Sequence, residues 1–486
     1  MLVVNLLSKI QRGKVIIICL LITLPLHSFS QTERSVWGLG YGRPSFSMIF
    51  STSGITFDSI PGPNYCPVML GCASIADSTG NLLFLCNGFT ISNKIGQPMV
   101  NGQGLSPTQF SSVYANSGNP TPGSVIAIPD PLNNSEFYLF HYSTNYSTLK
   151  GDSLHYSKIN MNLDNGHGAV TIKNQVLAVD SFTPGQLAAV KHANGRDYWL
   201  IAHQFNSNLY YKFLISTNGI SLIDTQSIGH AFRNSGESMF SPDGNFYASY
   251  QSFNKLDLFS FDRCSGRLFN DFHYAMPDST PTFGFCFSPN SQLIYISGRT
   301  ELYQMDITVS DPYSTLDTVA IYDGFANPEP TTFCMQQLAP DGKIYIASFG
   351  STKYLHVIEY PDIYGIGCNV RQHAITLPYY NNGTVPNLPF YELGKDIGSL
   401  CDTITDRIKE IDISMINLYY ENNLIKVRSF SNIDKLKLYN IQGKLIIQTL
   451  VNNTEADLNT EAIRKGIYIL EAEFNTQKFR QKVVIN

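Results

Sequence analysis

The segment Ala339-Pro-Asp-Gly-Lys-Ile-Tyr-Ile-Ala347 decides the fold of most of this chain, because it joins a tight turn directly to a strand. In Pro-Asp-Gly the proline fixes φ, the aspartate bonds to the local backbone and the glycine tolerates a positive φ. The Ile-Tyr-Ile-Ala stretch that follows is β-prone and apolar on both faces. Such a strand is typical of a sheet that is covered on both sides.

This turn-and-strand unit recurs along the chain, six times in all, at intervals of 47 to 60 residues. A period of about 50 residues that contains several strands predicts the blade of a β-propeller. The other five units are Asp77–Leu85, Asn134–Phe140, Asn194–Ile201, Ser241–Ala248 and Ser288–Ile296. Further strands follow most units and supply the outer part of each blade, as at Leu209–Ile215, Leu256–Phe261 and Leu355–Tyr360.

The predicted propeller domain spans residues 31–395. Its length accommodates seven blades of this period, with six or eight as the alternatives. We expect the seventh blade to be assembled from both ends of the domain, by pairing a strand near Ser47–Ile49 with the segment Leu377–Phe390. The predicted fold class is therefore all-β.

Residues 1–30 have the layout of a secretory signal peptide. Lys9, Arg12 and Lys14 precede the apolar run Val15–Leu24, and small residues follow. The predicted cleavage site is Ser30-Gln31. The apolar run is only about ten residues long, too short to span a membrane as a helix, so we expect no transmembrane segment in the mature chain.

A second, small all-β module is predicted at residues 416–486, after a polar linker at 396–415. Tyr439-Asn-Ile-Gln-Gly-Lys-Leu445 places two strands around a Gln442-Gly443 turn, and Lys465-Gly-Ile-Tyr-Ile-Leu470 begins another strand after a glycine. Gln481-Lys-Val-Val-Ile-Asn486 ends the chain on a final strand. The alternating apolar residues favour a small Ig-like β-sandwich.

These segments resemble the type A C-terminal sorting domain of the bacterial type IX secretion system. The residues that carry the motif are Tyr439, Gly443, Lys444, Gly466, Tyr468, Val483 and Val484. The resemblance implies passage through the periplasm to the outer-membrane surface or the medium. The implied partners are the type IX secretion machinery and its sortase, which removes the module. The body is then released or anchored to lipopolysaccharide.

The body is similar to the propeller-like N-terminal regions of large secreted proteins from bacteria that use this system. The resemblance lies in Trp37–Gly42, Gly71–Phe84, Ala188–Trp199, Phe261–Gly266 and Gln337–Tyr345. It implies no particular activity.

Composition limits the function classes. Charged residues make up 15% of the chain and aromatic residues 12%, the net charge is −5, and no Lys/Arg cluster follows the signal peptide. We therefore do not expect the protein to bind nucleic acid. Of nine cysteines, eight remain after signal removal, and in an oxidising compartment we expect disulfides. Their pairing is not determined by the sequence.

Few residues indicate chemistry, and no phosphate-binding loop or nucleophile elbow is present. Six histidines recur through the blades and could line a central channel and hold a metal, although local hydrogen bonding explains them more simply; they are His141, His155, His192, His203, His230 and His273. Carboxylates facing the channel could serve acid–base catalysis, but turn chemistry explains three of the four candidates; the four are Glu237, Asp77, Asp243 and Asp341. The sequence thus predicts no catalytic residue, cofactor or metal.

Three classes of function remain. Binding or adhesion to a carbohydrate or protein ligand is favoured, because a Tyr-rich surface buries area at little entropic cost. The alternatives are a propeller hydrolase or lyase with a site at the channel mouth, and a structural component of a surface or gliding assembly. Converging ionised residues at the channel mouth would favour an enzyme, whereas an open aromatic face would favour binding.

Overall fold

The computed structural model describes residues 33–42, 44–61, 66–253, 255–277, 282–402, 416–421, 423–440, 444–474 and 477–485. The predicted signal peptide and its cleavage site at Ser30-Gln31 lie outside this part of the chain. The chain divides into two compact units, residues 1–402 and 403–486, and each is described by itself. No helix in the described ranges is long and apolar enough to cross a membrane.

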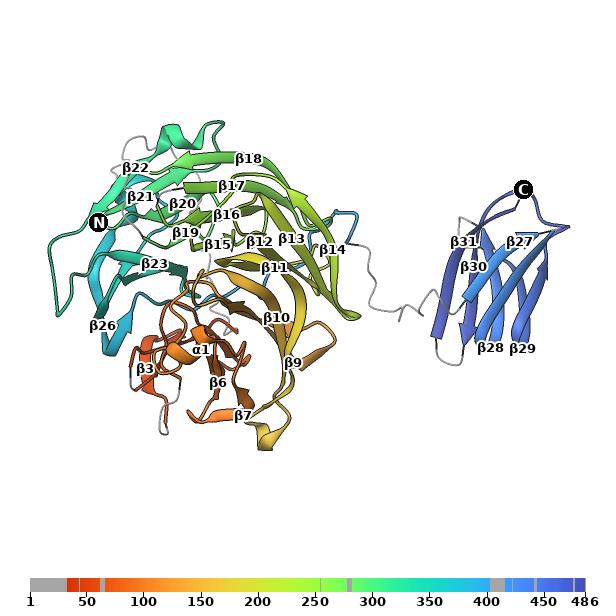
Figure 1. The fold of residues 1–486 in the computed structure, drawn as a ribbon. Coiled ribbons are helices and arrows are strands. Elements are labelled where there is room, and N and C mark those ends of the chain that lie inside the picture. Colours follow the sequence, from red (N-terminus) through yellow and green to blue (C-terminus); the bar gives the residue numbers. More distant parts are fainter. Residues whose placement is uncertain are drawn as a thin grey trace, which may run out of the picture. The chain divides into compact units, whose positions relative to one another are not determined.

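The first unit is a ring of seven antiparallel blades (Figure 1). Blade 1 contains β1 (Val36–Leu39), β2 (Phe46–Ser51) and β3 (Gly54–Ser59); blade 2 contains β4 (Ala73–Ala76), β5 (Leu82–Cys86), β6 (Thr90–Asn93) and β7 (Pro98–Gln103); blade 3 contains β8 (Val125–Asp130), β9 (Asn133–Thr144), β10 (Gly151–Asn160) and the first part of β11 (Ala169–Lys191). Blade 4 contains the last part of β11, β12 (Tyr198–Gln204), β13 (Leu209–Ser216) and β14 (Gly219–Ser227); blade 5 contains β15 (Gly236–Phe240), β16 (Phe246–Gln251), β17 (Lys255–Asp262) and β18 (Arg267–Ala275). Blade 6 contains β19 (Phe285–Phe287), β20 (Leu293–Ser297), β21 (Glu301–Asp306) and β22 (Asp317–Ile321); blade 7 contains β23 (Phe333–Leu338), β24 (Ile344–Ser348), β25 (Ser351–Ile358) and β26 (Val370–Asn382). Short helices, α1 (Gln109–Val113), η1 (Asp164–Gly166), η2 (Pro312–Thr315) and η3 (Gly365–Cys368), lie in the connections.

The repeat read from the sequence corresponds to one position in the blade. Five of the six units cover the turn into the second strand of a blade and the start of that strand, namely β5, β12, β16, β20 and β24, and the unit Asn134–Phe140 lies inside β9, the second strand of blade 3. Gly244 and Gly342 in the Pro-Asp-Gly turns have φ values of 73° and 79°, in the left-handed region that glycine accepts without strain. The predicted seven-bladed propeller is confirmed.

Closure of the ring differs from the prediction. In the described ranges β2 pairs only with β1 and β3, so no ladder joins Ser47–Ile49 to Leu377–Phe390. Residues 377–382 instead belong to β26, which pairs with β25, and Pro386 and Pro389 lack the backbone N–H that a ladder needs. Blade 1 is built from the N-terminal end alone.

Blade 1 lacks a paired innermost strand. β1 runs antiparallel to β4, the innermost strand of blade 2, as the bonds from Ser74 Oγ to Val36 O (3.0 Å) and from Ala76 N to Glu33 O (3.0 Å) show. β1 therefore occupies the position that the second strand holds in the other blades. Blade 1 then meets blade 7 through side chains, with the Trp37 and Tyr345 ring centroids 5.8 Å apart, and through one backbone bond, from Tyr41 N to Tyr380 O (2.8 Å).

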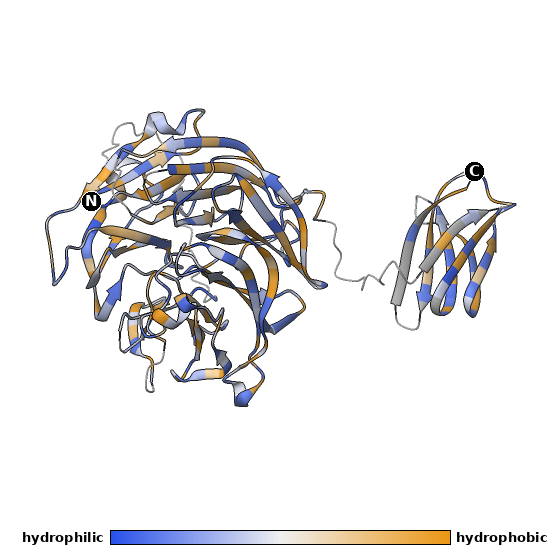
Figure 2. Cartoon of the chain, viewed as in Figure 1, coloured by the Kyte–Doolittle hydropathy of each residue, from blue (hydrophilic) through white to orange (hydrophobic). Residues whose placement is uncertain are grey.

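Aromatic side chains fill the spaces between blades, which accounts for their abundance. Tyr210 of blade 4 meets Tyr247 of blade 5 edge to face, with centroids 5.9 Å apart and planes at 89°. Tyr250 of blade 5 meets Phe285 of blade 6 at 6.4 Å. Such pairs add about 0.5–1.5 kcal/mol beyond the area they bury. Hydrophobic residues accordingly follow the strands in the interior of the ring (Figure 2).

The second unit is one five-stranded sheet folded over a single core. Its strands are β27 (Ile416–Glu421), β28 (Leu424–Asn440), β29 (Leu445–Asn459), β30 (Gly466–Phe474) and β31 (Gln477–Ile485). The long strand β28 pairs with β27 through its first half and with β30 through its second half, and its register with β29 shifts between Arg428 and Ile433. Val427, Leu438 and Leu470 are among the buried core residues. The predicted small all-β module is confirmed. Its five strands form one continuous hydrogen-bonded sheet.

Candidate functional site

The central channel of the propeller is filled by the protein's own chain, residues 383–396, here called the channel segment. The backbone N–H of Asn387 donates to Cys72 O (3.0 Å), and its side-chain amide donates to Val125 O (3.3 Å) and Leu187 O (3.1 Å). The Tyr391 hydroxyl donates to Ala127 O (2.8 Å). One segment is thus bonded to the inner edges of three blades.

The space between the channel segment and blades 3, 4 and 5 is small. A void of about 10 Å³ lies between it and the inner strands of blades 3, 4 and 5, room for about one water molecule. This void is too small for a ligand larger than water, so we look for a ligand site on the faces and outer edges of the ring.

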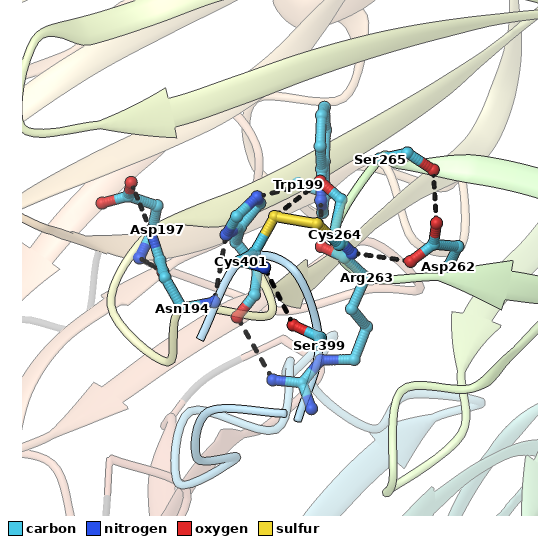
Figure 3. The surroundings of a disulfide bond; sticks show 10 residues. Asn194, Asp197, Trp199, Asp262, Arg263, Cys264, Ser265, Ser399 and Cys401 are labelled. Atoms are coloured by element: carbon cyan, nitrogen blue, oxygen red, sulfur yellow. Dashed lines mark hydrogen bonds between the residues drawn. A yellow bond between two sulfur atoms is a disulfide. The ribbon is translucent and has the colours of Figure 1, made fainter. Parts of the chain in front are cut away.

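The channel segment leaves the ring beside the turns of blades 4 and 5 and is fastened there by a disulfide (Figure 3). Asp396 N–H donates to Ala193 O (2.8 Å), and the Arg263 guanidinium donates to Gly394 O. Cys401 then forms a disulfide with Cys264, 137 positions earlier in the sequence. Residues 396–402, predicted as part of the linker, are therefore attached to the body.

The expectation of disulfides is met by this one pair among the described residues. The other six cysteines of the predicted mature chain are unpaired and buried: Cys66, Cys72, Cys86, Cys286, Cys334 and Cys368. Burial raises the pKa of the Cys86 and Cys286 thiols to about 12. Protonated buried thiols are poor nucleophiles, so these six serve packing.

The six histidines do not line the channel, so the predicted alternative of a metal held in the channel is wrong. None of the six histidines belongs to the innermost strand of a blade, and the buried ones have nearby hydrogen-bond partners. His141 Nδ1 lies 2.6 Å from Ser106 Oγ, and its Nε2 lies 3.1 Å from Ser157 Oγ. Burial, and then the neighbouring His155, lower the pKa of His141 to about 3, and burial lowers that of His203 to about 3. Both remain neutral.

Two of the six histidines come together around a carboxylate that the sequence did not single out. Asp257 Oδ1 lies 2.7 Å from His230 Nδ1 and 2.9 Å from His273 Nδ1. Asp257 is on β17, His273 is opposite it on β18, and His230 is in the connection between β14 and β15. Asp257 is fully buried, whereas both imidazoles are part exposed. This group, here called the His–Asp cluster, has the donor atoms of a transition-metal site.

The turn aspartates act as caps, as turn chemistry indicates. Asp77 Oδ1 accepts from Thr79 N and Asn81 N, both at 2.9 Å, and Asp243 Oδ1 accepts from Asn245 N at 3.0 Å. Asp341 Oδ1 accepts from Lys343 N at 3.2 Å.

Glu237, the fourth carboxylate candidate, differs from the turn aspartates because it is buried on the innermost strand β15. Burial raises its pKa to about 8. The three turn aspartates do not supply the second carboxylate that acid–base catalysis by Glu237 would need, because each of them caps its own turn.

Aromatic rings are exposed in an ordered row beside β18. The planes of Phe272 and Tyr274 lie at 6° to each other with centroids 6.4 Å apart, and those of Tyr274 and Tyr313 at 10° and 5.7 Å. Phe272 and Tyr313 are 37% and 40% exposed. The Tyr313 hydroxyl donates to Ala275 O (3.1 Å), which ties blade 6 to the end of β18. These three residues are here called the aromatic array.

Motif residues of the second unit face one another across β30 and β31. Tyr468 pairs with Val483 across β30 and β31, and the Tyr468 hydroxyl donates to Arg464 O (2.8 Å). Gly466 begins β30 opposite Ile485. The remaining motif residues are Tyr439 on β28, Lys444 at the start of the β29 hairpin, Val484 on β31, and Gly443, which lies outside the described residues.

Comparison with protein families identifies this second unit. Residues 415–486 match the model of a secretion system C-terminal sorting domain. The chain therefore consists of a β-propeller body followed by a type IX secretion sorting domain, and it is directed for export to the cell surface or the medium. No curated protein matches the chain.

Solved structures resemble the chain at low identity. A Lactobacillus plantarum protein is 13% identical, with 73% of this chain and 99% of that one covered and a TM-score of 0.42. A Bacteroides fragilis protein proposed to be a 6-phosphogluconolactonase is 13% identical, with coverages of 72% and 97% and a TM-score of 0.45. The β-propeller domain of Myceliophteria thermophila Cps50 (Swd1) is 11% identical, with coverages of 66% and 91% and a TM-score of 0.37.

Sequence reasoning missed Asp257 and the aromatic array. Asp257 carries a usable signal, because it is a lone carboxylate inside the apolar run Leu256-Asp-Leu-Phe-Ser-Phe261. The array carries none, since Tyr313 comes from a connection in blade 6 and meets β18 only in the folded ring.

Proposed function

We propose that this exported protein binds carbohydrate through the aromatic array on the outer edge of blade 5. The observation that carries the proposal is the near-parallel order of Phe272, Tyr274 and Tyr313 together with the exposure of the two end rings. Aromatic rings present large apolar faces with few rotatable bonds, so little entropy is lost when a ligand packs on them.

Polar groups beside the rings suit a hydroxylated ligand. Asn270 lies two positions before Phe272 on the exposed strand β18. Asp311 lies near the Tyr274 hydroxyl, and burial followed by this carboxylate raises the pKa of Tyr274 to about 12. Carboxylate and amide groups next to an apolar ring face match the alternating hydroxyls and C–H faces of a sugar ring.

The filled channel argues against the alternative of an enzyme with a channel-mouth site. Leu388 and Phe390 are 3% and 5% exposed within the channel segment, where a substrate would otherwise enter.

The test is a glycan array probed with the purified full chain and with variants. We expect Phe272→Ala and Tyr313→Ala each to weaken binding of the retained glycan about 10-fold, the upper end of what an aromatic contact contributes. Tyr146→Ala is the matched control, because Tyr146 is as exposed as Tyr313, at 40%, and lies in the turn between β9 and β10.

Two results would overturn the proposal. Glycan binding that survives both substitutions would place the site elsewhere. An array on which the full chain retains no glycan, while a protein partner loses affinity on Phe272→Ala, would assign the surface to a protein.

A further inference from the structure

We propose that the His–Asp cluster binds a divalent transition-metal ion of the zinc type on the surface between blades 4 and 5. The proposal is independent of carbohydrate binding. It concerns His230, Asp257 and His273, and it rests on their geometry, on their hydrogen bonding and on the charge of Asp257.

The spacing of the donor atoms is close to that of a metal site. The two contacts of Asp257 Oδ1, at 2.7 Å to His230 Nδ1 and 2.9 Å to His273 Nδ1, bring all three donors together, and the ring centroids are 4.2 Å apart. Zinc bonds of about 2.0–2.2 Å in a tetrahedral site place donors roughly 3.3 Å apart. All three donor atoms lie within 4.8 Å of one another, so an ion is admitted by a movement of the imidazoles that brings each donor to this spacing. Both are free to make it, since His230 and His273 side chains are 42% and 31% exposed.

Hydrogen-bond accounting supports a cation in this position. His273 Nε2 lies 3.1 Å from Asp271 Oδ2 while its Nδ1 faces Asp257. Carboxylate oxygens only accept, so a proton or a cation must lie in each of the two gaps. A metal-binding histidine commonly donates its other N–H to a carboxylate, which fixes the ring and its tautomer. Asp271 stands in that position.

The charge of Asp257 points the same way. Its side chain is 0% exposed, and the backbone N–H of His230 donates to its Oδ2 at 2.7 Å. No lysine or arginine forms an ion pair with it in the described ranges, where its ion-pair partners are the two imidazoles. A buried carboxylate is costly without a compensating charge, and a divalent ion would supply one.

The scaffold around the cluster is rigid where the carboxylate lies and open toward solvent. Asp257 and His273 are directly paired across β17 and β18. The chain reaches His230 through Gly229, where φ is 80° and a Cβ would lie 2.6 Å from Asp257 Oδ2. Three protein donors leave at least one coordination position for water or a ligand, as in open zinc sites.

The test measures Zn²⁺ binding by the tag-free full chain with isothermal titration calorimetry. We expect one ion per chain, and at least a 100-fold loss of affinity in His230→Gln and in Asp257→Asn. Asp271→Asn should weaken binding about 10-fold, the effect of removing an outer carboxylate. His230→Gln is the decisive variant because His230 is part exposed, so the variant should fold even where Asp257→Asn does not.

His373→Ala is the matched control. His373 Nε2 also pairs with a carboxylate, Asp323 at 2.9 Å, and its side chain is similarly exposed at 34%, but it does not belong to the cluster. The His373→Ala variant should bind Zn²⁺ with the same affinity as the unmodified chain. Co²⁺ should give a visible spectrum without thiolate charge-transfer bands, which separates this site from the buried cysteines.

The proposal is wrong if the full chain takes up no Zn²⁺ or Co²⁺. It is equally wrong if folded His230→Gln binds as the unmodified chain does, or if the Co²⁺ spectrum shows thiolate ligation.

Discussion

The buried carboxyl of Glu237 makes the stability of the propeller depend on pH. Its side chain is 5% exposed, Oε2 has no hydrogen-bond partner among the described residues, and burial raises its pKa to about 8. The folded state keeps a proton that the unfolded state loses above about pH 4.5. The free energy of unfolding therefore falls as the pH rises from about 4.5 to 8.

We expect Glu237→Gln to remove this dependence. The variant should match the unmodified chain near pH 4.5 and exceed it at pH 8 by up to about 5 kcal/mol, the value of the full pKa shift. Urea unfolding of both proteins at pH 5, 6.5 and 8 measures the difference. Glu329→Gln, at an exposed position, should leave the two pH curves parallel. A parallel pair for Glu237→Gln would contradict the burial argument.

The sequence predicted residue roles well where a role is local. Asp77, Asp243 and Asp341 cap their own turns because the atoms they bond lie two to four positions away. It could not predict the His–Asp cluster, since His230 comes from the connection between two blades and meets Asp257 only when these blades pack.

The channel segment is the element that joins the inner strands of different blades. The side-chain amide of Asn387 by itself bonds to two blades, to blade 3 at Val125 O and to blade 4 at Leu187 O. Asn387→Ala removes the donor for two buried carbonyls, at a cost of about 1–3 kcal/mol for each group left without a partner. We expect a lower urea midpoint with an unchanged denaturant slope.

The control for this variant is Asn218→Ala in the exposed turn between β13 and β14, which should change the midpoint little. An equal midpoint for Asn387→Ala would mean that the channel segment is not part of the cooperative fold.

At the scale of elements, the strands and turns of the blades followed from the sequence, but the channel segment did not. Apolar runs after Pro-Asp-Gly mark β16 and β24 directly. Val385-Pro-Asn-Leu-Pro-Phe390 has neither the alternation of a strand nor a helical period, because its contacts are made by single side chains to several blades. Pattern reasoning has no rule for such a segment.

At the scale of the molecule, the two units should fold separately. The core clusters of the body draw only on residues before the connector, and the core of the sorting domain draws only on residues after it. We expect a chain ending at Asp402 to fold but to remain in the periplasm, because it lacks the sorting domain. Cell fractionation measures this, with melting of the purified fragment as the check on folding. Finding the fragment on the cell surface would contradict the assignment of the export signal to residues 416–486.

Maturation should leave the disulfide on the body. We propose that a sortase removes the sorting domain after export and that the body is released or attached to lipopolysaccharide. Since Cys401 is bonded to Cys264, cleavage should fall after residue 402. Mass spectrometry of surface material should then find peptides up to Cys401 and none from 416–486. Recovery of intact chains outside the cell would contradict removal.

The bond between Cys264 and Cys401 also determines how the body responds to tension. A pull on the C-terminal end reaches the ring at Cys401 and passes through the sulfur atoms to Cys264, in the turn between β17 and β18. The covalent path bypasses every residue between the two cysteines, including the channel segment. A force on the tail is therefore borne by the fifth blade, and the residues that fill the channel stay unloaded.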